Sequence, residues 1–396
     1  MLKKALLAGM VAGLIGAATL AVPECLADDA YEIPVIVPQS GGASFVGAGQ
    51  RQYLELVEAY TNRTGGIRGR PVHFTFYDDQ TSPQVAVQLA NQVLAANPTV
   101  VLGSSLVGMC NAMAPLMKNG PVLFCLSPGF HPQPGSYAFS SSTSSLDQVA
   151  AAIRYFREKG WTKLAILNST DASGQDGDRA VMAALAMPEN KDMQLVEKQS
   201  FNPTDVSVSA QMERIKASGA TAMISWTTGA PVALVFKAMI QAGLDIPLVP
   251  TSGNQTFAQM EQYAGFLPRQ FMVPSALYPE HDGLLVLDPR VEKRQHEMYA
   301  VLAEHGLKAD NMVATSWDAG LIVVEGLRAL GPQADAATMR AYIAGLSDFA
   351  GVDGVYDFKA HSERGLGGDS AAIMRYESEG RRWGWLSQPG GAPLAR

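Results

Sequence analysis

Residues 99–131 hold two short apolar segments separated by a stretch with helical periodicity. The segments at 100–102 and 122–126 are apolar without interruption, and both end in small polar residues. Between them Met109 and Met113 recur at helical spacing, so the stretch predicts a strand, a helix and a second strand. Strands that are apolar throughout are typical of parallel sheets, because helices cover both faces of such sheets.

The alternation of strand and helix continues on both sides of this stretch. Earlier in the chain we expect strands at 33–37 and 72–77, a turn-rich segment from Pro38 to Gly49, a helix from about Gln50 and a helix that starts at Pro83. Later expected strands lie at 164–167, 194–200 and 222–225, and expected helices at 147–159, 175–187, 205–218 and 230–242. This pattern predicts parallel sheets covered by helices.

The pattern occurs twice in 396 residues, a length that exceeds one ordinary hydrophobic core. We therefore expect an α/β fold of two similar lobes, linked by the polar segment Phe139 to Ser145, with the ligand site in the cleft between them. The remaining expected elements are a crossover strand at 271–278, helices at 289–305, 312–330 and 337–346, and antiparallel strands within 354–386. The last residues, 388–396, are rich in Pro and Gly, and we expect them to fray.

Small polar residues follow both strands of the central stretch. Ser104 and Ser105 come after the first strand, and Ser127, Pro128 and Gly129 come after the second. In open α/β sheets ligands bind outside the carboxyl ends of the strands. These five residues are therefore candidate ligand-binding residues.

Residues 1–27 have the layout of a cleaved secretory signal peptide. Lys3 and Lys4 precede an apolar run at 5–22, and Ala27 is a small residue suited to cleavage. A retained membrane anchor is the alternative, since the run is long enough to span a bilayer. A lipid anchor at Cys25 is disfavoured because Glu24 precedes it. The formal charge of the chain is -7, without a basic run, which argues against nucleic acid as a partner.

Two cysteines remain after removal of such a signal. Cys110 lies on the expected central helix and Cys125 on the strand that follows it, elements that must pack together. In an exported protein this placement favours a disulfide between Cys110 and Cys125, and two buried free thiols are the alternative. We expect no metal site, because no histidine lies near them at ligand spacing.

Several segments, in this order, resemble the type I periplasmic binding proteins, and most closely the branched-chain amino-acid (leucine) binding family of ABC transporters. Besides the signal sequence, the segments are GGIRGRPV at 65–72, DDQTSP at 78–83, SP at 127–128, GNQTF at 253–257 and SWDA at 316–319. The resemblance implies two Rossmann-like lobes with parallel sheets, joined by a three-crossover hinge. The crossovers would fall near 139–145, 271–278 and 348–354. Lobe 1 would comprise 28–141 plus 276–348, lobe 2 would comprise 142–275 plus 349–390, and 391–396 would form a tail.

The resemblance also suggests roles for individual residues in the first lobe. Serines after the two central strands would hold a ligand carboxylate, which points to Ser127 and, slightly upstream of the usual position, to Ser104 and Ser105. Phe45 matches a position where relatives place an aromatic ring over the ligand, and core packing is the alternative. His131 is a further candidate for a ligand carboxylate, with a plain exposed loop as the alternative.

In the second lobe, Ser173 stands where relatives often carry a tyrosine, so an aromatic wall would be lost. Trp226, Thr227 and Thr228 end a strand and should face the cleft, and a buried structural role is the alternative for Trp226. Asn254 follows a segment in which relatives that bind amino acids carry an acid for the ammonium group.

This chain has Pro250, Thr251 and Ser252 in that segment, and no acid. A buried cation needs a paired anion. We therefore expect a carboxylate ligand without an ammonium group, such as an aromatic or keto acid, in preference to an amino acid. Asp171 and Asp176 lie near the second-lobe loop and are the alternative source of an anion, with solvated loop charges as the commoner explanation for both.

The resemblance implies a periplasmic solute-binding component of an ABC importer. It would act as a monomer without a cofactor, close around a small-molecule ligand and dock on a membrane permease. A periplasmic sensor that presents the closed form to a receptor is one alternative. A hydrolase built from Ser127 and His131 is another, but the chain lacks G-x-S-x-G, H-E-x-x-H and P-loop motifs, so we expect no enzyme.

Overall fold

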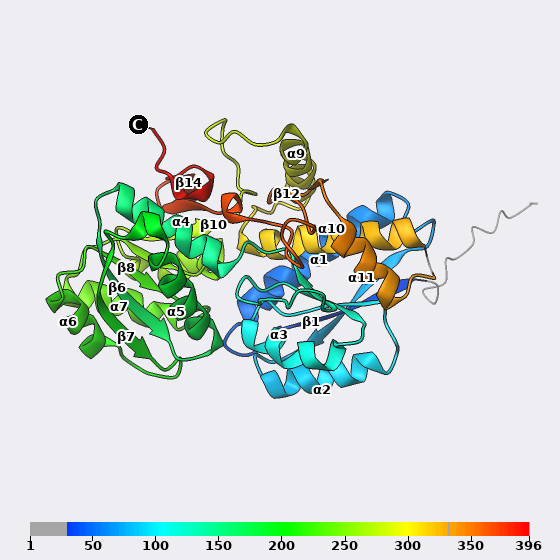
Figure 1. Ribbon diagram of the computed structural model, residues 1–396, viewed down its shortest axis with the longest axis horizontal. Coiled ribbons are helices and arrows are strands. Elements are labelled where there is room, and N and C mark those ends of the chain that lie inside the picture. Colours follow the sequence, from blue (N-terminus) through cyan, green and yellow to red (C-terminus); the bar gives the residue numbers. More distant parts are fainter. Residues whose placement is uncertain (1–29, 332, 396) are drawn as a thin grey trace, which may run out of the picture.

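The computed structural model describes residues 30–331 and 333–395, and the predicted signal peptide lies outside them. The chain forms two α/β lobes side by side (Figure 1), one coloured mainly blue to cyan and the other mainly green. The predicted fold class, with two lobes that contain parallel sheets, is confirmed. No helix in the described ranges has the length and apolar character needed to cross a membrane.

The first lobe contains a five-stranded parallel sheet in the order β2-β1-β3-β4-β5. Its strands are β1 (Tyr31–Val37), β2 (Val72–Asp78), β3 (Val100–Leu102), β4 (Val122–Cys125) and β5 (Ala138–Ser140). Strands β3 and β4 are fully buried, as their uninterrupted apolar sequences predict. The register places Leu102 beside Phe124, so the loops after both strands begin at the same edge of the sheet.

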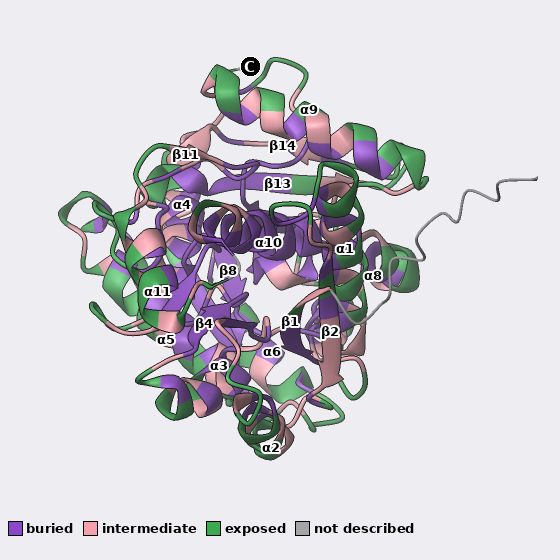
Figure 2. Ribbon diagram, turned by 90° about the vertical axis from the view of Figure 1, so that its right-hand side faces the viewer, coloured by how far each residue is buried: buried purple, intermediate pink, exposed green. Residues whose placement is uncertain are grey.

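Helices cover both faces of the first sheet. One face packs against α2 (Pro83–Leu94) and α3 (Val107–Met113), and the other against α1 (Ser44–Arg63), α10 (Asn311–Leu330) and α11 (Ala336–Gly345). Helix α9 (Pro289–Glu304) adds to the second group. Figure 2 shows α10 buried along most of its length, which explains why it is apolar on all sides.

The second lobe repeats this connectivity with four parallel strands in the order β7-β6-β8-β9. The strands are β6 (Lys163–Ser169), β7 (Gln194–Phe201), β8 (Ala222–Ser225) and β9 (Leu248–Pro250). Helices α4 (Ser145–Glu158) and α5 (Ala172–Leu185) cover one face, and α6 (Ser209–Ala217), α7 (Val232–Ala242) and α8 (Phe257–Tyr263) lie on the other side. Both sheets therefore have a strand-order switch at which ligands can bind.

Small antiparallel units complete the fold. Strands β10 (Met272–Ser275), β13 (Ala372–Glu377) and β14 (Arg382–Trp385) form one sheet, and β11 (Phe349–Ala350) pairs with β12 (Val355–Tyr356). Short 3-10 helices lie at Ala114–Met117, Pro188–Asn190, Ser252–Asn254, Ala264–Phe266, Gly368–Ser370 and Pro389–Gly391. The antiparallel strands expected near the end of the chain are thus present.

Helix α1 begins at Ser44 and not near Gln50, so part of the expected turn-rich segment is helical. The glycines that suggested a turn have another cause. A Cβ on Gly47 would lie 2.0 Å from the Pro38 carbonyl oxygen, and one on Gly49 would lie 2.6 Å from Met312 Cγ. These glycines permit close packing inside a helix and do not interrupt it.

The polar segment 139–145 contains a strand, β5, that the sequence did not predict. Ser140, Ser141 and Ser142 are buried, although their composition is typical of an exposed linker. The Ser140 hydroxyl donates to the Ser127 carbonyl at 3.3 Å, and the Ser142 hydroxyl donates to the Leu126 carbonyl at 3.1 Å. Backbone partners therefore make a serine-rich crossover compatible with burial.

The third crossover was expected near 348–354, but Tyr356 and Phe358 belong to the hydrophobic core of the first lobe. Leu366 also packs there, whereas Ala371 and Ile373 belong to a core of the second lobe. We therefore propose that the chain makes its third crossing between Leu366 and Ala371.

The chain beyond β14 folds back instead of fraying as expected. The Gln388 N–H donates to the Ala392 carbonyl at 2.7 Å, and the Leu394 N–H donates to the Leu386 carbonyl at 3.0 Å. Leu394 also packs against a core of the second lobe. Pro and Gly in this segment form an ordered turn, so the expectation of a frayed end is wrong for the described residues.

Candidate functional site

A cavity of about 460 Å³ lies between the two lobes, at the carboxyl edges of both parallel sheets. Its walls include the start of α3 and the loop after β4 from the first lobe, and the starts of α4 and α5 with the loops after β8 and β9 from the second. The volume falls in the range that accommodates a small organic ligand. This cavity is the candidate ligand site.

Seven of the predicted site residues line the cavity. They are Ser105, Ser127, Pro128, Gly129, Ser173, Trp226 and Thr228. The other four, Phe45, Ser104, Thr227 and Asn254, lie close to it without forming its wall. The fold therefore brings residues from distant parts of the chain to one place, and ligand contact by each of them stays a prediction.

Ser104 and Ser105 have different surroundings. The Ser104 hydroxyl accepts from the Leu106 N–H at 3.3 Å and lies against Asp79, so it shapes the loop beneath the cavity. The Ser105 hydroxyl is buried and has no hydrogen-bond partner among the described residues. Ser105 is thus the residue of the pair with a free polar group beside the cavity.

Asp79 is a fully buried carboxyl group directly after β2. Burial raises its pKa to about 6, although hydrogen bonds from the Thr81 N–H and the Ser104 hydroxyl act in the opposite direction. One of its oxygens, Oδ2, has no partner among the described residues. Asp79 therefore supports the loop that carries Ser104 at a cost in stability when it is ionised.

Cys110 and Cys125 form a disulfide, as predicted, with their Cα atoms 6.2 Å apart. Cys110 lies on α3 and Cys125 ends β4. The residues just before Cys110 and just after Cys125 line the cavity. The disulfide therefore ties together the two segments that form the first-lobe wall.

Hydroxyl groups form a chain along the second-lobe wall. Ser173 Oγ lies 3.0 Å from Thr228 Oγ1, which lies 3.2 Å from Thr251 Oγ1. Beneath them the Asn254 side-chain amide donates to the Thr227 carbonyl at 2.8 Å and to Thr251 Oγ1 at 3.0 Å. Asn254 thus holds the loop after β9 against the end of β8, and does not face the cavity.

The two aromatic candidates differ in position. Trp226 is 2% exposed, lines the cavity and packs in the second-lobe core. Its position therefore agrees both with a residue that faces the cleft and with a structural residue of the core. A Cβ on Gly177 would lie 2.2 Å from Trp226 Cβ, which shows how closely α5 packs on the tryptophan. Phe45 packs against the first-lobe core and is not part of the cavity wall.

Two carboxylates, Asp171 and Asp176, line the cavity, so the absence of an acid near Asn254 does not extend to the whole site. Asp171 is the N-cap of α5 and accepts from the Gly174 N–H at 3.0 Å. Asp176 has a side chain only 2% exposed, and its Oδ1 lies 2.7 Å from His131 Nε2. Both carboxylates are therefore already engaged by groups of the protein.

The sequence contained a signal for this arrangement that the expected start of α5 obscured. We expected the helix from about Gln175, but an Asp followed by small residues at 171–174 is a typical N-cap. With the helix starting at Ala172, Asp176 lies in its second turn. In that position it reaches the first lobe.

The arrangement does not favour a hydrolase. His131 pairs with Asp176, and no hydrogen bond between His131 and Ser127 occurs in the part of the chain that the structure describes. The same residues contain no group of three or more His, Cys, Asp or Glu side chains arranged to hold a metal ion. Among the described residues that line the cavity none is Lys, Arg or His, so an anionic ligand would depend on hydroxyl and N–H donors.

Comparisons with known proteins agree with the geometry. The family model described as periplasmic binding protein matches residues 30–381. The chain is 22% identical over 233 residues to the leucine-, isoleucine-, valine-, threonine- and alanine-binding protein of Pseudomonas aeruginosa, an alignment that covers 58% of this chain and 62% of that relative.

Solved structures show the same fold at low sequence identity. A periplasmic binding protein type 1 from Bordetella pertussis Tohama I superposes with a TM-score of 0.77 and 22% identity, covering 90% of this chain and 99% of that one. The branched-chain amino acid transporter substrate-binding protein LivJ from Streptococcus pneumoniae, in complex with isoleucine, has a TM-score of 0.75 and 16% identity, covering 89% and 97%.

Proposed function

Because the chain belongs to the periplasmic binding protein family, we propose that it is the solute-binding component of an ABC importer of the branched-chain amino-acid type. It would act in the periplasm as a monomer and deliver its ligand to a membrane permease. The observation that carries the proposal is the cavity between the lobes, whose wall is drawn from both of them. A ligand that contacts both lobes at once favours the closed arrangement, and this differential binding is what drives hinge closure.

We propose a small ligand with a carboxylate group. The first-lobe wall offers the Ser105 and Ser127 hydroxyls, and the second-lobe wall offers the hydroxyl of Thr228. Hydroxyl donors satisfy a carboxylate without a cationic side chain. Apolar residues such as Val107 and Met109 complete the wall and suit an apolar body on the ligand.

An aromatic or other organic acid without an ammonium group remains the preferred class. Asp171 caps a helix, and Asp176 is shielded and paired with His131, so neither is a free anion for a ligand ammonium. An amino acid is the second candidate, favoured by Asp176 Oδ2, which has no partner among the described residues. The amino-acid-binding relative from Pseudomonas points in the same direction.

Thermal unfolding of the mature protein against a ligand panel tests the proposal. The panel contains leucine, other amino acids, benzoate-like acids, keto acids and the matching amides. A ligand at about a hundred times its dissociation constant should stabilise by roughly 2.7 kcal/mol. Stabilisation by acids without an ammonium supports the preferred class, stabilisation by leucine or its relatives supports the second, and conversion of the ligand into a product contradicts a binding role.

Transport and sensing are separated by a genetic experiment on the same ligand. Uptake of the radiolabelled ligand into cells should fall to background when the gene is deleted and return with the wild-type chain. Undiminished uptake, together with a lost transcriptional response to the ligand, would instead support a sensor.

A further inference from the structure

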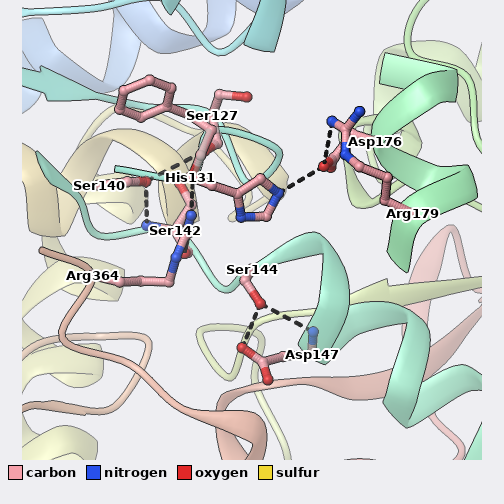
Figure 3. Close-up of polar contacts among 10 residues, drawn as sticks. Ser127, His131, Ser140, Ser142, Ser144, Asp147, Asp176, Arg179 and Arg364 are labelled. Carbon is pink, nitrogen blue, oxygen red and sulfur yellow. Dashed lines mark hydrogen bonds and ion pairs between the residues drawn. The ribbon is translucent and has the colours of Figure 1, made fainter. Parts of the chain in front are cut away.

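A polar contact between two side chains joins the two lobes beside the cavity. His131 lies in the loop after β4 of the first lobe, and Asp176 lies on α5 of the second. Figure 3 shows the imidazole ring pointing across to the helix, with Nε2 2.7 Å from Asp176 Oδ1. Because the two residues belong to different lobes, this contact can exist only while the lobes are together.

The loop that carries His131 closes tightly over Asp176. A Cβ on Gly129 would lie 2.7 Å from Asp176 Oδ2, so only glycine allows this approach. Asp176 is almost completely shielded, whereas the His131 side chain is 49% exposed. The carboxylate is therefore covered by the other lobe, and separation of the lobes would return it to water.

The loop itself is held firmly in the first lobe. The Arg364 guanidinium is buried and donates to the Phe130 carbonyl and, at 2.6 Å, to the Ser142 carbonyl. Arg364 thus fixes the backbone at Phe130, immediately before His131. A fixed loop presents the imidazole to Asp176 with little loss of conformational freedom.

Three further charged groups, Arg179, Arg364 and Asp147, surround the contact between His131 and Asp176. Arg179, on the same helix as Asp176, places Nη2 3.3 Å from Asp176 Oδ1. Arg364 interacts electrostatically with both Asp176 and Asp147. Asp147 also accepts a hydrogen bond from the Ser144 hydroxyl. Arg179 belongs to the second lobe and stays with Asp176 whether the lobes are closed or open. Arg364 lies in the first lobe with His131, so both of their attractions to Asp176 depend on closure. A guanidinium keeps its charge over the pH range in which a histidine changes its own, so His131 is the one that makes the attraction depend on pH.

We propose that His131 and Asp176 form a latch that stabilises the closed arrangement of the lobes, and that the latch is stronger at acid pH. The inference rests on the proposed function. A histidine changes its charge between pH 5 and 8, and a hydrogen bond from an imidazolium to a carboxylate is stronger than one from a neutral imidazole. Since Arg179 already balances part of the Asp176 charge and His131 is half exposed, we expect the closed-to-open ratio to change by about three- to tenfold.

Distance measurements between the lobes test the latch without a ligand. Leu116 and Met182 are exposed, lie on different lobes and do not line the cavity. Spin labels on Leu116→Cys and Met182→Cys, in the mature protein with its disulfide intact, report the separation of the lobes by electron double resonance. The short-distance population should be larger at pH 5.5 than at pH 8.0, and His131→Ala should reduce it and remove the pH dependence.

His73→Ala is the matched control, because His73 pairs with Glu58 at 3.3 Å within the first lobe and is similarly exposed. It should leave the distances and their pH dependence unchanged. Gly129→Ala provides a second perturbation, since its new methyl group presses on Asp176 and should favour the open form at both pH values. Circular dichroism confirms that each variant is folded.

The proposal is overturned if the wild-type distances do not change between pH 5.5 and 8.0, or if His131→Ala behaves as the wild type does. This outcome is independent of the ligand panel. A protein that binds no member of the panel would contradict the proposed function while the distances still decide on the latch. A protein that binds a ligand but shows unchanged distances would contradict the latch alone.

Discussion

Cys110 and Cys125 join α3 to the end of β4, directly beneath the first-lobe wall of the cavity. The bond closes a loop with a sequence separation of 15 residues. Loops of this length are stabilised by a disulfide mainly through restriction of the unfolded chain. The same bond restrains the two segments that carry Ser105 and Ser127.

Replacement of both cysteines by serine should lower the free energy of unfolding by about 2–4 kcal/mol. It should also weaken ligand binding, because the cavity wall loses its covalent restraint. Urea unfolding and calorimetric titration measure the two effects. Wild-type protein treated with a reductant is the matched comparison and should behave as the double variant does. Equal stability of oxidised and reduced wild type would contradict a structural role for the bond.

Asp79 should make stability fall as the pH rises. Its pKa in the folded protein is about 6, raised by burial above the value of about 4 of an unfolded chain. Protonated Asp79 therefore favours the folded state, a contribution that is complete below pH 4 and is lost as the pH rises through 6. Asp79→Asn should be more stable than the wild type at pH 7.5 by up to about 2–3 kcal/mol, and the difference should shrink towards pH 4.

Urea unfolding at several pH values measures this difference, and Asp335→Asn is a control with the opposite sign. Hydrogen bonds from the backbone N–H and the side chain of Thr338 lower the pKa of Asp335, so its ionised form stabilises the fold. Asp335→Asn should therefore lose stability at neutral pH relative to acid pH. A constant difference between Asp79→Asn and the wild type at all pH values would show that the Asp79 charge is not the cause.

Gly177→Ala should destabilise the second lobe and displace a cavity wall. The new methyl carbon would lie 2.2 Å from Trp226 Cβ, too close for either residue to keep its position. We expect a loss of about 1–3 kcal/mol, as is typical of overpacking, together with a change in tryptophan fluorescence. Gly345→Ala is the control, because a Cβ on Gly345, at the end of α11, would meet no neighbouring atom within 4 Å and because alanine favours a helix. A neutral Gly177→Ala would mean that α5 can move away from Trp226 freely.

The sequence predicted the parallel strands well where apolar runs are uninterrupted. Val100 to Leu102 and Ala222 to Ser225 are buried strands at the predicted positions. The crossover around Ser140 was harder to predict, because its burial depends on backbone carbonyls supplied by another loop. Composition alone does not reveal such partners, which is why a serine-rich strand was interpreted as an exposed linker.

The candidate site was predictable at the level of strand ends and less so at the level of side chains. The rule that ligands bind at the carboxyl edge of a parallel sheet places both Ser104 and Ser105 near the cavity. It does not distinguish Ser105, on the cavity wall, from Ser104, which turns towards Asp79. The approach of Asp176 to His131 joins two lobes, and periodicity within one lobe contains no information about that contact.

Thr227 and Thr228 offer a direct test of which side chains face the ligand, since they are adjacent and take the same substitution. Thr228 lines the cavity and links the Ser173 and Thr251 hydroxyls, so Thr228→Val removes a donor and leaves both neighbours without that partner. We expect ligand affinity to fall by about tenfold, the effect of one lost hydrogen bond.

Thr227 Oγ1 is buried without a partner in the described structure and lies outside the wall, so Thr227→Val should leave affinity unchanged and not lower the melting temperature. Calorimetric titration with whichever ligand stabilises the protein decides between them, and a greater loss of affinity in Thr227→Val would mean that the strand end presents the other hydroxyl to the ligand.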